Sequence, residues 1–361
     1  MVLKYGNEIN DIEEEQAERP WFRYGAELVV MMLILLLILG GVYARASTKS
    51  IVISESIRGI SGESMFEEDV FTDWSVLPVA VKTNDSKIYV PIPIMARPEN
   101  ISVENYYQDH TLFIRIKGTH AANFEEVTIT GATTHVLAAA FREYGGEVRV
   151  SLLMDGIWDF NISQENSQLV IEPYKSSDRY ENTIALVVND ETSEAVAEIA
   201  ADLCASLQTG PAGRESAEKE EVYFPSARIY VAEYRSKEDI LGFIQDSESD
   251  MVLILNTAQS DDPGQYGMSA RYNGNYFIPE LDNGTVAECF LRNMAVSAKN
   301  RAVSITSSAE DSILNDLEIP AAEITIGYTT NELEGTYLLD EKYRAKIAEG
   351  IINAVKEVTE R

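Results

Sequence analysis

The number and position of the histidines limit the metal chemistry that this chain can perform. The sequence contains three histidines, His110, His120 and His135, and residues 174–361 contain none. Proteins hold zinc with imidazole, thiolate and carboxylate ligands. Sites built from carboxylates alone suit calcium or magnesium better. The second half of the chain therefore lacks the ligands from which a zinc centre is usually built.

The other residues with reactive side chains give no clear catalytic pattern. His120 and His135 could approach each other across a hairpin, but we expect surface or structural histidines. Cys204 and Cys289 fall in helix-patterned segments and match no ligand spacing, so we expect buried thiols that pack in the core. The sequence contains no Gly-x-Ser-x-Gly motif and no phosphate-binding glycine loop.

A stretch near the end of the chain carries the strongest pattern. Residues 323–328 read as a buried strand that leaves through Gly327 into a polar turn. Beyond Asp340, which suits a helix N-cap, Ile347, Ile351 and Val355 recur every four residues. This spacing predicts a C-terminal helix with one apolar face.

The same stretch resembles the C-terminal end of the zinc-dependent N-acetylmuramoyl-L-alanine amidases, which cut peptidoglycan. The residues in register with that family are Pro320, Ala321, Gly327, Tyr328, Asn331, Tyr343, Ile347, Ala348, Gly350 and Ile351. The resemblance extends over roughly residues 183–358. It implies a zinc ion held by two histidines and a glutamate, and a further glutamate that polarises the zinc-bound water.

Each of these functional positions is substituted in this chain. The first histidine of the family would follow the strand at 184–188, where Asn189, Asp190 and Glu191 stand instead. The glutamate ligand would fall near Thr192 and the second histidine on Asn256. The catalytic glutamate would fall on Thr325. The resemblance therefore implies a degenerate amidase-like domain that lacks the zinc ligands and the catalytic base.

Two functions follow from this comparison. The first is an amidase-like pseudoenzyme, without a cofactor, that has a binding or regulatory role in bacterial cell-wall metabolism. Its old cleft would contain Asn189, Asp190, Asn256 and Thr325, and its partners would be peptidoglycan fragments or envelope proteins. The alternative is an active amidase that binds zinc through displaced carboxylates, which are Asp190, Glu191, Glu194 and Glu323. A purely structural part of an envelope complex is a third possibility.

Strands and helices alternate between residues 183 and 361, which predicts an α/β domain with a largely parallel central sheet. We expect strands at 183–189, 227–232, 251–255 and 323–328, and helices at 193–207, 237–246 and 285–298 besides the C-terminal one. The polar segment 256–275 reads as a loop, and residues 210–221 read as a surface loop.

Residues 86–175 predict a small all-β sandwich. Leu112, Ile114 and Ile116 alternate with Arg115 and Lys117, as in a strand with one buried face. Segments 136–144 and 147–153 flank a Gly-Gly turn, which predicts a hairpin. Further alternation occurs at 158–162 and 169–171. Two prolines suggest that the strand at 87–94 lies at a sheet edge. The region loosely resembles the AMIN-type β domains that accompany amidases.

The N-terminus predicts a membrane anchor. Residues 1–25 are polar and acidic, and residues 26–46 contain an uncharged apolar run, from 28 to 44. At about 1.5 Å per residue, such a run just spans a bilayer core. Cleavage at Ala44-Arg45-Ala46 as a signal peptide is the alternative. We expect a retained anchor, a cytoplasmic N-terminus, a connector at 47–85 and an extracytoplasmic bulk.

The net charge of −30 excludes nucleic acid as a natural partner, because the phosphates would be repelled.

Overall fold

The computed structural model describes residues 53–55, 74–81, 86–93, 96–131, 133–189, 196, 198–200, 227–275, 281–310 and 312–360. The chain divides into Met1–Lys49 and a compact unit from Ser50 to Arg361, and every described residue belongs to the second. The predicted membrane segment lies outside the described residues. Among the helices that are described, none is both long and apolar enough to cross a membrane.

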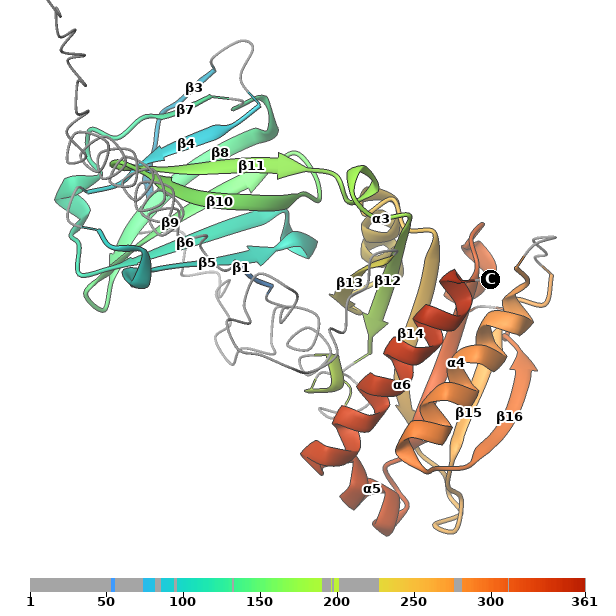
Figure 1. Cartoon of the computed structure of the whole chain (residues 1–361). Helices are drawn as coiled ribbons and strands as arrows, with labels where there is room; N and C mark the ends of the chain where they lie inside the picture. The colour runs from blue at the N-terminus through green and yellow to red at the C-terminus, as the bar shows by residue number, and fades with distance from the viewer. Residues whose placement is uncertain are drawn as a thin grey trace, which may run out of the picture. The chain divides into compact units, whose positions relative to one another are not determined.

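Residues 86–175 are all-β, as predicted, and three strands from the segment expected to be a connector, 47–85, join their two sheets (Figure 1). The six-stranded sheet has the order β1-β5-β6-β9-β8-β2, and the five-stranded sheet has the order β10-β11-β4-β7-β3. The strands are β1 (Ile53–Glu55), β2 (Ser75–Val76), β3 (Val79–Val81), β4 (Ile88–Pro91), β5 (Ile101–Tyr106), β6 (Thr111–Lys117), β7 (Ile129–Gly131), β8 (Val136–Tyr144), β9 (Glu147–Met154), β10 (Asp159–Glu165) and β11 (Gln168–Tyr174). Short 3-10 turns connect them: η2 (Pro98–Asn100), η3 (Tyr107–Asp109), η4 (Ala121–Asn123) and η5 (Thr133–His135).

Side chains from both sheets share one apolar core. Leu112, Ile114 and Ile116 of β6 are buried in it, while Lys117 is exposed. The predicted hairpin is confirmed, because β8 and β9 pair antiparallel and are joined through Gly145 and Gly146. Both glycines adopt positive φ, 59° and 82°, which side-chain-bearing residues rarely do.

The prediction of an edge strand at 87–94 is wrong. β4 lies inside its sheet, between β11 and β7. Its Pro91 is tolerated because β7 pairs only with Ile88 and Tyr89, so no neighbour on that side needs an N–H from residue 91. On the other side Pro91 lies opposite Gln168 at the very end of the strand.

The second region is α/β and is built on a six-stranded sheet of order β13-β12-β14-β17-β15-β16. The strands are β12 (Asn182–Val188), β13 (Ala227–Glu233), β14 (Met251–Ala258), β15 (Met268–Tyr272), β16 (Ala302–Ser307) and β17 (Ala321–Tyr328). The helices are α3 (Lys237–Asp246), α4 (Asn283–Ala298), α5 (Glu332–Leu338) and α6 (Glu341–Thr359), with 3-10 turns η6 (Ser176–Asp178) and η8 (Ile313–Asp316).

The expected parallel pairing holds for β13-β12-β14-β17, whereas β15 runs antiparallel to β17. The sheet is therefore mixed. Of the helix expected at 193–207, residues 196 and 198–200 are helical and the rest lie outside the described residues, as do Cys204 and residues 210–221.

Two apolar cores cover opposite faces of this sheet. Helices α4 and α6 pack on one face against alternate residues of β17 such as Ile324 and Ile326. Helix α3 and η8 cover the other face, where Ala321 of β17 is buried in the core. The predicted C-terminal helix is confirmed, with Asp340 accepting the N-cap hydrogen bond from the Tyr343 N–H. A Cβ at Gly350 of α6 would lie 2.5 Å from the Met294 Cα of α4, so the two helices approach closely there.

Residues 107–110 of the β region contact the edge strand β13. The Gln108 side chain donates to the Glu233 carbonyl (2.8 Å) and accepts from the Glu233 N–H (3.0 Å), as a neighbouring strand would. The Tyr107 hydroxyl accepts from the Val231 N–H at 2.7 Å. Nearby, Arg228 and Asp159 form a buried bidentate ion pair, with 2.9 Å between Nη2 and Oδ1.

Candidate functional site

The carboxyl ends of three parallel strands bring predicted site residues together. Asn189 follows β12, Asn256 lies near the end of β14, and Thr325 lies in β17. Asn256 and Thr325 are direct register partners. The Asn189 N–H donates to the Leu255 carbonyl at 3.0 Å, which places Asn189 beside the residue that precedes Asn256.

A hydrogen-bond network joins two of the predicted residues to Glu323. The Thr325 hydroxyl donates to Asn256 Oδ1 at 2.9 Å. The amide group of Asn256 donates through Nδ2 to Glu323 Oε1. Glu323 and Thr325 are two residues apart and share a strand face, as the sequence predicts. We call Asn256, Glu323 and Thr325 the strand-end cluster.

Arg271 is the residue of this site that sequence reasoning missed. It lies opposite Glu323 on β15, with 3.9 Å between its Nη1 and Glu323 Oε1. The guanidinium is 58% exposed and the carboxylate 16% exposed. No sequence signal points to this neighbour, because residues 256–275 have the polar, glycine-containing composition of a loop and hide strand β15.

The remaining predicted residues fall in a part of the chain that the structure does not describe. Asp190, the Thr192 position, and the carboxylates Glu191 and Glu194 lie outside the described residues. Among the residues that are described, no group of three His, Cys, Asp or Glu side chains could hold a metal ion.

The three histidines each pair with a different carboxylate. His120 contacts Glu143 at 2.9 Å, His135 contacts Asp155 at 3.1 Å, and His110 contacts Asp246 at 3.3 Å. They therefore do not form a shared site. Cys289 is buried in the core as predicted, at 1% exposure.

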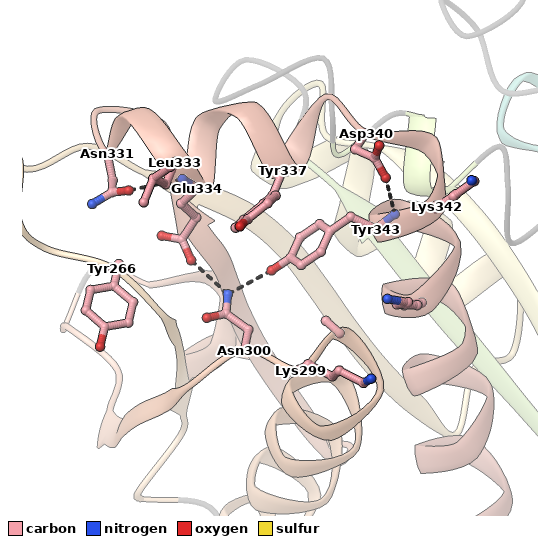
Figure 2. Close-up of a pocket in the computed structure, with 12 residues that line it drawn as sticks. Tyr266, Lys299, Asn300, Asn331, Leu333, Glu334, Tyr337, Asp340, Lys342 and Tyr343 are labelled. Atoms are coloured by element: carbon pink, nitrogen blue, oxygen red, sulfur yellow. Dashed lines mark hydrogen bonds between the residues drawn. The ribbon is translucent and has the colours of Figure 1, made fainter.

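A cavity of about 670 Å³ lies apart from the strand-end cluster, on the side of the sheet that α4, α5 and α6 cover (Figure 2). Its walls come from the loop before β15, the end of α4, helix α5 and the start of α6. The lining residues are Tyr266, Ala298, Lys299, Asn300, Asn331, Leu333, Glu334, Tyr337, Asp340, Lys342, Tyr343 and Lys346.

Glu334 organises the floor of this cavity. It is 4% exposed, and its carboxylate accepts hydrogen bonds from the Gly267 N–H (3.1 Å), the Tyr328 N–H (2.7 Å) and the Asn300 amide (2.8 Å). A Cβ on Gly327 would lie 2.8 Å from the Glu334 Cδ, so glycine leaves the room that the carboxylate occupies. The spacing of Asn331 and Glu334 is the signal that could have predicted a helix start there.

Asn300 connects Glu334 to Tyr343. Its amide nitrogen also donates to the Tyr343 hydroxyl at 2.8 Å (Figure 2). Burial raises the pKa of Tyr343 to about 12. The phenol is therefore neutral at physiological pH and keeps its own proton as a donor.

Comparison with known proteins gives no family assignment from sequence. No family model matches the chain, and no curated protein matches it.

Solved structures of amidases align with half of the chain. The catalytic domain of CwlV, an N-acetylmuramoyl-L-alanine amidase from Bacillus (Paenibacillus) polymyxa var. colistinus, is 12% identical, with a TM-score of 0.39, and the match covers 49% of this chain and 98% of that domain. An N-acetylmuramoyl-L-alanine amidase from Clostridium difficile 630 is 16% identical, with a TM-score of 0.39, covering 50% and 98%. The CwlD amidase from Clostridioides difficile, solved in complex with the GerS lipoprotein, is 15% identical, with a TM-score of 0.37, covering 49% and 97%.

Proposed function

We propose that the α/β region is a non-catalytic, amidase-like binding module that acts in bacterial cell-wall metabolism, held outside the membrane by the N-terminal segment. The observation that carries this proposal is that both polar atoms of the Asn256 side-chain amide are hydrogen-bonded. Its oxygen accepts from Thr325 and its nitrogen donates to Glu323, so both ends of the side chain are engaged. Asn256 stands where the resemblance places a zinc ligand, and Thr325 stands where it places the catalytic base.

The strand-end cluster does not suit zinc. An amide oxygen that already accepts a hydrogen bond replaces an imidazole, and the carboxylate beside it contacts the Arg271 guanidinium at 3.9 Å. A divalent cation bound to Glu323 would face that positive charge at short range. Zinc also prefers imidazole and thiolate ligands, which residues 174–361 could supply only through two cysteines. The residues present therefore do not fit a zinc ion.

The side chains of the strand-end cluster are suited to binding a polar ligand. Amide, hydroxyl and carboxylate groups at the ends of strands hydrogen-bond to the hydroxyls and peptide groups of a polar ligand, and their positions are fixed by the sheet. A fragment of peptidoglycan offers such groups. The resemblance to the amidases is what suggests this ligand class, although its matching residues such as Gly327 and Asn331 shape the scaffold rather than the strand-end cluster.

The test is a pair of measurements on the purified full-length chain. Calorimetry with muropeptides should detect binding, and incubation with intact peptidoglycan should release no peptide. Thr325→Val, which removes the hydroxyl from the cluster, should weaken binding about threefold to tenfold. The control is Thr134→Val, the same change at an exposed threonine of η5 in the β region.

Two experimental results would contradict this proposal. Stoichiometric zinc in the purified chain, together with release of peptide from peptidoglycan, would establish the alternative of an active amidase with displaced ligands. The absence of muropeptide binding would overturn the binding module itself.

A further inference from the structure

The cavity between α4, α5 and α6 is rich in positive charge, which is unusual in this acidic protein. Three of its lining residues are lysines, Lys299, Lys342 and Lys346, in a chain whose net charge is −30. Within the described part of the chain, none of the three ammonium groups forms an ion pair with a carboxylate. Lys342 and Lys346 are four residues apart on α6, so they lie on the same side of that helix.

The two acidic residues of the cavity are already engaged. Glu334 accepts backbone and amide N–H groups at the floor. Asp340 accepts the Tyr343 N–H as the cap of α6. The three lysines outnumber these two carboxylates, and both carboxylates are held by internal donors, so the cavity keeps a net positive charge toward a ligand.

A further donor points to an anionic ligand. Tyr343 is 9% exposed, and its hydroxyl oxygen accepts from Asn300 (Figure 2). Its proton has no acceptor among the described residues. A buried hydroxyl that can still donate favours a ligand that brings an acceptor into the cavity.

The rim of the cavity is apolar. Tyr266, Leu333 and Tyr337 are 48%, 69% and 54% exposed, although each is a large hydrophobic residue. The ring of Tyr337 stacks on that of Tyr343 with 5.7 Å between centroids. Exposed apolar side chains beside a charged wall are typical of a recognition site for a ligand with both characters.

The geometry favours carboxylates over phosphate. Phosphate sites usually use the free N–H groups of a helix N-terminus or of a backbone nest. Here the Asp340 side chain caps the N-terminus of α6, so recognition depends on lysine side chains spread over two elements. Lysine ammonium groups on separate elements can each pair with a different carboxylate along a bound peptide. A cavity of about 670 Å³ holds a short peptide segment rather than a single ion.

We propose that this cavity binds an acidic peptide segment of a partner protein, with its carboxylates on Lys299, Lys342 and Lys346 and an apolar side chain on the tyrosine rim. The site shares no residue with the strand-end cluster and does not depend on muropeptide binding.

The experiment measures fluorescence anisotropy of labelled hexapeptides with the full-length chain. The probe contains Asp and Glu around one Leu, and its reference contains Asn and Gln in the same positions. The acidic probe should bind at least about tenfold more tightly, and less tightly as salt rises. Lys299→Gln, Lys342→Gln and Lys346→Gln should each weaken binding about threefold to fivefold. The matched control is Lys117→Gln, an exposed lysine of β6.

A second variant separates binding from folding. Lys299 ends α4 with a positive φ of 55°, which glycine adopts without strain. Lys299→Gly should therefore bind the probe less tightly while its melting temperature is unchanged or higher. Equal binding of the neutral peptide, displacement of the probe by inorganic phosphate at similar concentration, or an equal loss in Lys117→Gln would each overturn the proposal.

Discussion

At the scale of single residues, Glu334 is the side chain on which most local structure depends. Its buried carboxylate satisfies N–H groups from the loop before β15, from the end of β17 and from Asn300. These segments are far apart in the sequence, so one carboxylate fixes their relative positions. A charged acceptor with several donors is among the stronger hydrogen-bonding arrangements in proteins.

Glu334→Gln should therefore destabilise the fold by about 2–3 kcal/mol. The amide replaces an acceptor oxygen with an NH₂ group that faces N–H donors. Denaturant unfolding of the two proteins measures the difference. The control is Glu332→Gln on the same helix, where the side chain is exposed and the change should be within about 0.5 kcal/mol. Equal losses in both variants would contradict the role of Glu334.

At the scale of elements, the contact between the β region and strand β13 depends on a buried ion pair. The side chains of Arg228 and Asp159 are 9% and 8% exposed, and the guanidinium also donates to the Ile229 carbonyl. The more exposed pair of Arg235 and Asp109 lies at the same contact. Removing one partner of a buried pair leaves the other charge unsolvated, which costs more than the pair itself contributes.

Arg228→Met should therefore destabilise the protein by about 3–5 kcal/mol, and adding Asp159→Leu should recover much of that loss. Chemical denaturation of the single and double variants gives the coupling energy. Arg235→Met, at the pair whose side chains are 26% and 16% exposed, should cost about 1 kcal/mol. A double variant as unstable as Arg228→Met would show that packing, rather than the orphaned carboxylate, sets the cost.

The elements that the sequence predicted correctly are those with a regular buried face. The hairpin β8–β9, helices α3 and α4, and the C-terminal helix around Ile347 and Ile351 alternate or repeat clearly. β15 was missed because residues 256–275 are polar and contain glycines. β16 was missed because its alternation of Val303 and Ile305 with Ser304 and Thr306 is short, and its two large apolar side chains stay exposed, at 38% and 39%.

Two residues of the strand-end cluster could be predicted, because they lie on strands with a regular buried pattern. Asn256 and Thr325 follow from the register of parallel strands, whose ends meet at one edge of the sheet. Arg271 was not predictable, because its neighbour relation depends on the antiparallel strand β15. The cavity near Glu334 was not predictable either, since its walls come from four separate segments.

At the scale of the whole molecule, the charge of −30 acts on the folded state. Repulsion among many carboxylates disfavours compact structures, and salt screens it. The melting temperature should therefore rise as sodium chloride increases from about 20 mM to about 500 mM, where the Debye length falls well below 10 Å. Differential scanning calorimetry measures the shift. A melting temperature that falls with salt would show that attractive ion pairs outweigh the repulsion.

The two ends of the mixed sheet differ in one further respect. At β13 the side chain of Gln108 occupies backbone groups of the edge, whereas β16 pairs only with β15 in the described part of the chain. Residues 302–308 carry no charge and no proline, the features that usually block unwanted strand pairing. An added strand, in assembly or in aggregation, should therefore extend this sheet at β16 rather than at β13, and a lysine or proline placed in β16 should block it.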